Sequence, residues 1–441
     1  MNGCFAPLWG DGMPRWLHAG LLGLATAAAL AGCAGQRAAC VSACKGRSLT
    51  ELFPPREPQS IQFDDHDVGD LSEVERELGL RDRPGHEYYE LSVPDCQCRA
   101  AAVSTEGNSL AAERRSIESS AKHGGLSDSE QLKVRILRTG ELEARNKSAG
   151  QALEVYYHLA EALANRYVLI DSILETDEAL KMVDEVRGQG LAITFDDGEI
   201  RRQRLELTRK QVALDLQTSQ LNAQLIRLLG LPATDLIARF WPTTDWKVVV
   251  EPIDMTLAVA EGLAMRPEIR LLESLPASLN KKTVSVVMLL MSGGSGGLLG
   301  TQMKASTMIS LFGIREILSK ARDRKRELSA RRRQLAEYTE QRRQEVTTEI
   351  QLAVLTVEAR LREIAVERQL SLAWKQRLDQ LEKRQRIEEA TFADLTAVKL
   401  KAFQAESDEI GRVVAWKIAL AKLKEAQGKL IDECRGTCFP R

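Results

Sequence analysis

Apolar side chains recur every three or four positions over long stretches of this chain, which is the period of one face of an α-helix. The first such pattern runs from Ser127 to Arg187, more than fifty residues without a proline, and ends at Gly188 and Gly190. A second pattern over residues 200–229 stops at Gly230 and predicts an antiparallel return. The positions expected to face inward are Tyr156, Leu159, Leu163, Tyr167, Ile170 and Leu174, then Leu214, Leu221, Leu225 and Leu228.

The same arrangement returns later in the chain. Residues 314–386 predict the longest helix and residues 392–430 its return. The turns Thr194-Phe195-Asp196-Asp197 and Thr391-Phe392-Ala393-Asp394 share the pattern Thr-Phe-x-Asp about 195 residues apart, so the hairpin is an internal repeat. A helix rises about 1.5 Å per residue, and hairpins of this size therefore extend far beyond a compact core. Inward positions are Val346, Ile350, Ala353, Val357, Leu361 and Ile364, then Leu395, Val398, Ala402, Ala405, Ile410, Val414, Ile418, Ala421 and Leu430.

Shorter elements surround the hairpins. A helix is expected over residues 99–122, and Ser127 with Glu130 forms a capping box for the next one. Residues 246–250 have strand character, as do residues 283–291 ahead of a glycine-rich turn. No Lys-Ser or Lys-Thr follows those glycines, which argues against a phosphate loop. The fold class is therefore mainly α, with two long antiparallel coiled-coil hairpins and short or vestigial strands near 284–312.

The N-terminus reads as an export signal. From a possible second start at Met13, Arg15 precedes an apolar run too short to span a membrane, which ends in Leu30-Ala31-Gly32-Cys33. That tetrapeptide resembles a bacterial lipobox, so Cys33 is the expected lipidation site. An ordinary signal peptide with a chance cysteine is the alternative. Ala34 after the cysteine favours the outer membrane.

Export changes the interpretation of the remaining cysteines. An even number of them in an oxidising compartment predicts disulfides, with fifteen possible connectivities. Metal binding is the alternative, although no histidine lies nearby. Cys96 and Cys98 are too close to bridge each other in an extended chain, so each is expected to pair elsewhere. The disulfide candidates are Cys40, Cys44, Cys96, Cys98, Cys434 and Cys438.

Composition excludes several classes of function. Aromatic residues make up 5% of the chain, and the net charge is −1, so nothing favours a nucleic-acid partner. Arg331 to Arg333 and Arg342-Arg343 are interleaved with glutamates, as on a solvated helix face. The histidines outside the leader are dispersed, and no catalytic, metal-binding or cofactor-binding constellation is found. We therefore expect no enzyme.

Together these features resemble the TolC-like outer-membrane efflux factor family over about residues 90–430. The resemblance implies a homotrimer whose hairpins form a periplasmic tunnel, with paired strands in an outer-membrane barrel. It also implies a periplasmic adaptor and an inner-membrane pump or secretion ATPase as partners. The marks, in chain order, are Gly190-Leu191-Ala192-Ile193-Thr194 before Asp196, Leu228-Leu229-Gly230-Leu231-Pro232, Arg266-Pro267-Glu268-Ile269, and Glu345-Val346-Thr347-Thr348-Glu349-Ile350.

The expected organisation follows: a signal peptide (1–32), a lipidated, cysteine-containing tether (33–98), a first repeat (99–232), a connector (233–255) and a second repeat (256–441). A non-conducting periplasmic lipoprotein that keeps the hairpins as a scaffold or adaptor is the alternative function. It is favoured by the short stretch 123–130, where the family has two membrane strands. Acidic residues at the tips are candidates for a cation-favouring entrance, or for helix N-terminal charge: Asp196, Asp197, Glu388, Glu389 and Asp394.

Overall fold

The computed structural model describes residues 88–120, 125–189, 197–232, 239–287, 324–385 and 392–434. Cys33, Cys40, Cys44 and Cys438 lie outside these ranges, so the predictions made for them stay predictions. The described strands are β1 (Tyr88–Ser92) and β2 (Arg239–Thr243). The described helices are α4 (Val93–Val103), α5 (Thr105–Ser120), α6 (Asp128–Gly188), α7 (Asp197–Leu228), α8 (Met255–Met265), α9 (Pro267–Ser278), α12 (Arg324–Gln385), α13 (Phe392–Ala426) and α14 (Leu430–Glu433).

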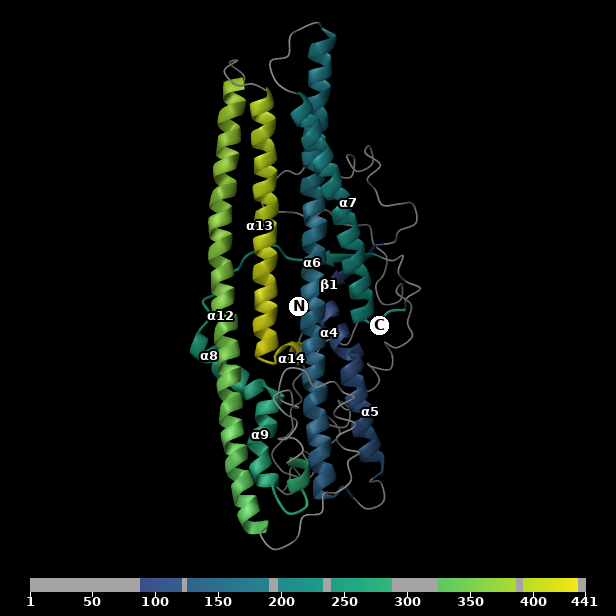
Figure 1. Ribbon diagram of the computed structural model, residues 1–441, viewed down its shortest axis with the longest axis vertical. Helices are drawn as coiled ribbons and strands as arrows, with labels where there is room; N and C mark the ends of the chain where they lie inside the picture. The colour runs from purple at the N-terminus through teal and green to yellow at the C-terminus, as the bar shows by residue number, and fades with distance from the viewer. Residues whose placement is uncertain are drawn as a thin grey trace, which may run out of the picture.

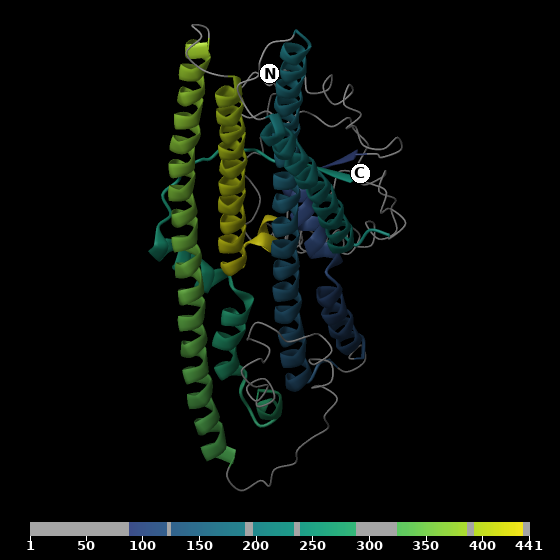
Figure 2. The same cartoon turned by 45° about the horizontal axis from the view of Figure 1, so that its top comes forward.

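The long helices lie side by side in the order α7, α6, α13, α12 (Figures 1 and 2). Helices α6 and α7 form the first hairpin and α12 and α13 the second, as the repeat predicts. Packing of α13 against α6 joins the hairpins, so both repeats belong to one layer. The mainly α fold with two long antiparallel hairpins is confirmed.

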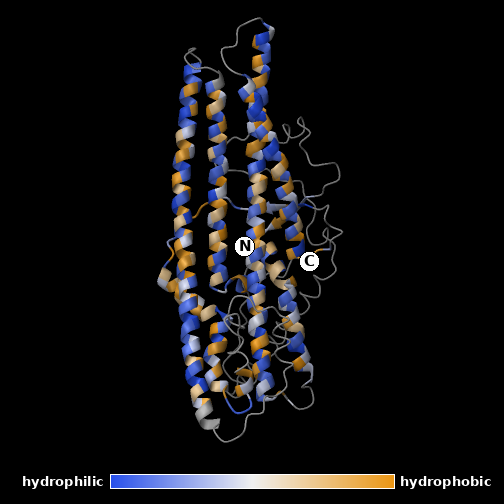
Figure 3. Ribbon diagram, viewed as in Figure 1, coloured by the Kyte–Doolittle hydropathy of each residue, from blue (hydrophilic) through white to orange (hydrophobic). Residues whose placement is uncertain are grey.

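The predicted apolar positions lie in the packed interfaces. On α6, Tyr156, Leu159 and Ile170 are each at most 1% exposed, and on α12 Val346 and Ile350 are fully buried. Apolar and polar residues alternate along all of these helices (Figure 3), which is the pattern of helices buried along one stripe. Within the described ranges, no helix combines the length and hydropathy needed to cross a membrane.

The capping box predicted at the start of α6 is present, with the Ser127 side chain accepting from the Glu130 amide and Glu130 accepting from the Ser127 amide. The return helices end alike. Gly230 (φ +64°) and Gly428 (φ +72°) are left-handed, a conformation that glycine adopts without steric cost. The next amide, of Leu231 or Lys429, reaches back five residues to a helix carbonyl. The duplication therefore extends to the capping geometry.

Shorter helices continue the layer beyond these ends. Helices α4 and α5 pack along α6 below α7, and α9 packs between α6 and α12 below α13 (Figure 1). Where sequence predicts one helix over 99–122, the structure has two, because the chain breaks at Ser104. The Ser104 hydroxyl accepts from the Gly107 amide and so begins α5 as a new helix.

The small sheet differs from the prediction. Residues 246–250 are not a strand; β2 precedes them and pairs in parallel with β1. Phe240 and Trp241 of β2 are buried, whereas Val249 and Val250 are 60% and 66% exposed, so burial rather than β-branching determines the strand. Residues 88–98, expected in the tether, form β1 and the first turns of α4, where the Ser92 side chain caps the helix.

The strand predicted from residue 283 is wrong over 284–287, which are helical. The Asn280 side chain accepts from the Lys282 and Thr283 amides, which starts a helical turn. Val286 and Val287 then pack with Leu271 and Leu275 of α9, so apolar burial is satisfied without a strand. The rest of the predicted pair, 288–312, lies outside the described residues.

Candidate functional site

The hairpin tips carry the predicted acidic residues. Asp197 opens α7 and Asp394 lies in the first turn of α13, at the same end of the layer (Figure 1). The Asp197 carboxylate accepts from Arg187 at 3.0 Å and Arg201 at 3.4 Å, and hydrogen bonding to Arg187 holds its pKa below the usual range. Asp197 therefore already has cationic partners. Asp196, Glu388 and Glu389 lie outside the described residues.

The outermost helices of the layer expose apolar stripes that the sequence analysis missed. On α7, Leu205, Val212 and Leu216 are 60–66% exposed, and their spacing of seven and four places them on one face. That face lies opposite the buried positions of α7, such as Leu225. The stripe on α12 comprises Leu352, Leu355, Val366 and Leu370, which are 46–65% exposed. Both outer helices of the layer therefore carry exposed apolar side chains.

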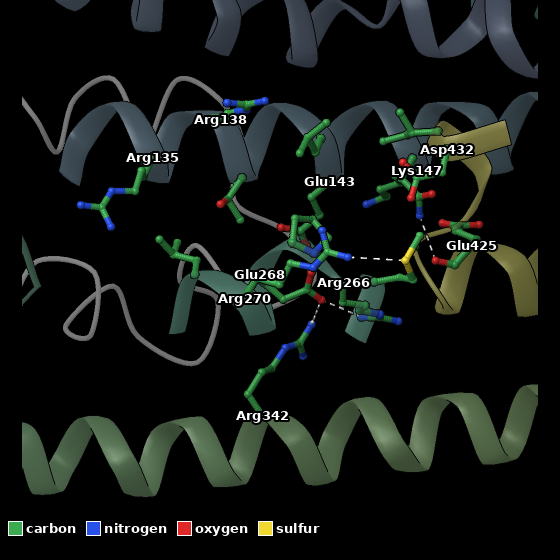
Figure 4. A pocket seen from close by; sticks show the side chains of 18 of the residues that line it. Arg135, Arg138, Glu143, Lys147, Arg266, Glu268, Arg270, Arg342, Glu425 and Asp432 are labelled. Carbon is green, nitrogen blue, oxygen red and sulfur yellow. Dashed lines mark hydrogen bonds and ion pairs between the residues drawn. The ribbon is translucent and has the colours of Figure 1, made fainter. Parts of the chain in front are cut away.

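A cavity of about 450 Å³ lies where α13 ends and α9 begins, between α6 and α12 (Figure 4). Apolar side chains such as Leu142 and Leu271 form part of its wall. The rest is unusually charged: Arg135, Arg138, Glu143, Lys147, Arg266, Glu268, Arg270, Arg342, Glu349, Glu425 and Asp432 all line it.

Arg266 and Glu268 hold this junction together. Glu268, 2% exposed, accepts from Arg266 at 2.9 Å and lies 3.5 Å from Arg342 of α12. Arg266 also pairs with Glu349 of α12 at 2.7 Å and donates through Nε to the carbonyl of Ala426, at the end of α13, at 2.5 Å. Sequence reasoning marked Arg266 to Ile269 as a motif but gave these side chains no role.

The first repeat has a corresponding arginine. Arg99 of α4, 2% exposed, donates through Nε to the carbonyl of Leu229 at 2.9 Å, just beyond the end of α7. In both repeats a buried guanidinium therefore satisfies a carbonyl left open where a return helix ends.

The structure brings together one pair of the predicted cysteines. The Cα atoms of Cys98 and Cys434 lie 5.2 Å apart, with their sulfur atoms within bonding distance. Cys96, two residues earlier on α4, is fully buried and forms no disulfide with a described cysteine; its thiol contacts the Ala152 carbonyl oxygen at 3.6 Å. Within the described ranges, no cluster of three or more His, Cys, Asp or Glu side chains is arranged to hold a metal ion.

Comparison with known proteins gives the class of fold. No protein-family model and no curated protein sequence matches the chain. Among solved structures, the Campylobacter jejuni CmeC outer membrane channel is similar with a TM-score of 0.54 at 10% identity, over 76% of this chain and 85% of that one. The outer-membrane channel OprN is similar with a TM-score of 0.52 at 13% identity, over 79% and 91%.

A membrane protein from Pseudomonas aeruginosa is similar with a TM-score of 0.50 at 16% identity, over 68% of this chain and 70% of that one. The likenesses to CmeC and OprN define the class: the chain has the fold of outer-membrane channels. More particularly, it is the fold of the TolC family, which the sequence marks predict.

Proposed function

We propose that this chain is a TolC-like outer-membrane efflux or secretion component whose hairpins form a periplasmic tunnel in a homotrimer. The proposal extends the fold to a role, and it includes a periplasmic adaptor and an inner-membrane pump or secretion ATPase as partners. A lipid on Cys33 would attach the chain to the periplasmic side of the outer membrane.

The observation that carries the proposal is the pair of apolar edges. The layer of described long helices ends at α7 on one side and at α12 on the other, where α8 covers part of the face, and each of the two helices exposes a stripe of leucine and valine. Apolar stripes on opposite sides of one subunit are what a ring needs, because each copy then offers one edge to the neighbour before it and the other to the neighbour after it. Monomers rarely leave such contiguous apolar surface in water.

Glutamate within either stripe tests the ring. We expect Leu216→Glu on α7 and Leu370→Glu on α12 each to convert a trimer into monomers, because a charge would be buried without a partner in the interface. The mass of the purified mature protein, measured by light scattering, reports the result. Leu372, 58% exposed on α12 but off the stripe, supplies the matched control: Leu372→Glu should leave the trimer intact. A trimer that persists in both stripe variants contradicts this arrangement.

Conduction separates the channel from the scaffold alternative. The purified protein in a planar bilayer is expected to give stable open-channel currents. A well-formed oligomer that passes no current favours the non-conducting periplasmic lipoprotein, which would keep the hairpins as a structural support or adaptor.

The acidic residues at the hairpin tips lead to a second prediction that current measurements can test. Acidic residues around a tunnel entrance favour cations, so reversing the charge of all of them together should lower the cation preference of the current. The residues to change are Asp196, Asp197, Glu388, Glu389 and Asp394. Because arginines already neutralise Asp197, changing that residue alone should have a smaller effect than the full set. Unchanged ion preference in the fivefold variant would contradict the entrance ring.

A further inference from the structure

Two carboxyl groups in the junction cavity form no close ion pair with a described residue. Glu143 points from α6 toward Glu268 and Arg266 (Figure 4), and Glu425 comes from the last turn of α13. No hydrogen bond or ion pair from a described residue reaches either carboxyl group. Both side chains are only partly exposed to solvent, and charges withdrawn from water are ordinarily paired, so these two carboxyl groups need an explanation.

The two arginines that face Glu143 are engaged with other partners. Arg266 binds Glu268, Glu349 and the Ala426 carbonyl, while Arg342 lies against Glu268 and donates to Glu345 at 3.0 Å. Glu268 therefore already pairs with the guanidinium groups that could otherwise pair with Glu143. A second nearby carboxylate is then disfavoured by both desolvation and like charge.

The surroundings of Glu425 also disfavour an ionised carboxylate. Its carboxyl group packs directly on Gly150 of α6, where a Cβ atom would overlap it. Burial, and then Glu349, raise the pKa of Glu425 to about 7; burial, and then Glu268, raise the pKa of Glu143 to about 8.

All elements around the two groups contribute charge. Glu143 faces Glu106 of α5, Arg266 and Glu268 at the start of α9, and Arg342 of α12. Glu425 faces Glu349 of α12, with Lys147 and Glu154 on α6 and Lys422 on its own helix. The cations Arg266 and Arg342 oppose the shift of Glu143 but are already shared with Glu268, and Lys422 is paired with Glu154.

We propose that Glu143 and Glu425 are two proton-binding sites that make the junction between α9, α13 and α6 sensitive to pH. With protons bound, the neutral carboxyl groups fit the cavity. When the protons leave, uncompensated negative charge develops beside Glu268 and Glu349, and it pushes the end of α13 and the start of α9 away from α6. The inference does not rest on the proposed tunnel, because every wall of the cavity belongs to one chain.

The direction of the pH effect follows from linkage. The pKa of a glutamate in the unfolded chain is about 4.3. Between that pH and the folded pKa values of about 7 and 8, the folded state binds more protons than the unfolded state. The contribution of these two groups to the free energy of unfolding is greatest below the unfolded pKa. It is lost as pH rises through neutrality, and the loss is complete just above about pH 8.

Thermal unfolding of the full mature chain at a series of pH values tests the proposal. From about pH 5 to about pH 8.5, the Tm of the unaltered chain should fall by roughly 5 °C more than that of Glu143→Gln/Glu425→Gln, because glutamine mimics the protonated carboxyl group and does not titrate. Glu178→Gln, on an exposed position of α6, is the matched control and should follow the unaltered chain. Parallel curves for the unaltered chain and the double variant overturn the proposal.

A second measurement needs no variant to fold. The infrared carbonyl stretch of protonated carboxylic acid should be present in the unaltered chain at about pH 7 and disappear by about pH 9. At the lower value ordinary glutamates are already ionised, and so is most of Asp171, whose pKa burial and Glu406 raise to about 6. Absence of that band at about pH 7 overturns the proposal. If the double variant is unstable, the single Glu425→Gln should still remove part of the band, and a band of unchanged intensity counts against the proposal.

Discussion

Replacing Arg266 with alanine is expected to lower the free energy of unfolding by roughly 3–5 kcal/mol, the usual effect of removing one partner from a buried ion pair. Glu268, 2% exposed, would be left beside Arg342 alone, and the carbonyl of Ala426 would lose its donor. Because Arg266 contacts the end of α13, the start of α9 and the side of α12, the loss affects three elements at once. Denaturant unfolding followed by circular dichroism measures it.

Arg343→Ala is the matched control for that experiment. Arg343 is one residue from Arg342 on the same helix and pairs with Glu273 at 2.6 Å, but both side chains are about half exposed. An exposed pair contributes about 0–1 kcal/mol. A similarly small loss in Arg266→Ala and Arg343→Ala would show that the junction does not depend on the buried network.

We propose that Cys98 and Cys434 form a disulfide, so Cys98→Ser is expected to lower the free energy of unfolding by roughly 2–5 kcal/mol. The cross-link would span 336 residues of sequence, so it would restrict the unfolded chain strongly. It would also tie α4, at the start of the first repeat, to α14, at the end of the second. Chemical unfolding of Cys98→Ser under oxidising conditions gives the measurement.

Variants of Cys434, the other cysteine of the proposed disulfide, provide the control. Cys434→Ser and the Cys98→Ser/Cys434→Ser double variant should both match Cys98→Ser, because one bond is lost in each case and the effects are not additive. A reducing agent should lower the unaltered chain to the same level and leave the variants unchanged. Additive losses, or an unaltered chain insensitive to reduction, would contradict the bond.

The long elements could be predicted because they depend on a pattern that repeats many times. The three-and-four spacing from Tyr156 to Ile170 and from Val346 to Ile364 specifies a buried stripe whatever the helix packs against. The Ser127 capping box and the helix end at Gly230 are local signals that involve only a few neighbouring residues, and the structure confirms both.

Elements whose state depends on distant contacts could not be predicted from pattern alone. Residues 284–287 are rich in valine, yet Asn280 starts a helical turn there, and the apolar side chains find cover on α9. Strand β2 forms because β1, over a hundred residues earlier, lies beside it. The roles of Arg266, Glu268 and Glu143 depend on three helices meeting at one point, and no spacing along the sequence encodes that.

The unequal lengths of the helices have a mechanical consequence. Helices α6 and α12 run unbroken through the whole layer, whereas their partners stop at Gly230 and Gly428 and are continued by separate short helices. Two continuous rods beside two segmented ones resist stretching along their axis but shear more easily where the segments meet. A lateral force applied at the hairpin tips would therefore concentrate its deformation at the segment ends, beside Arg99 and Arg266.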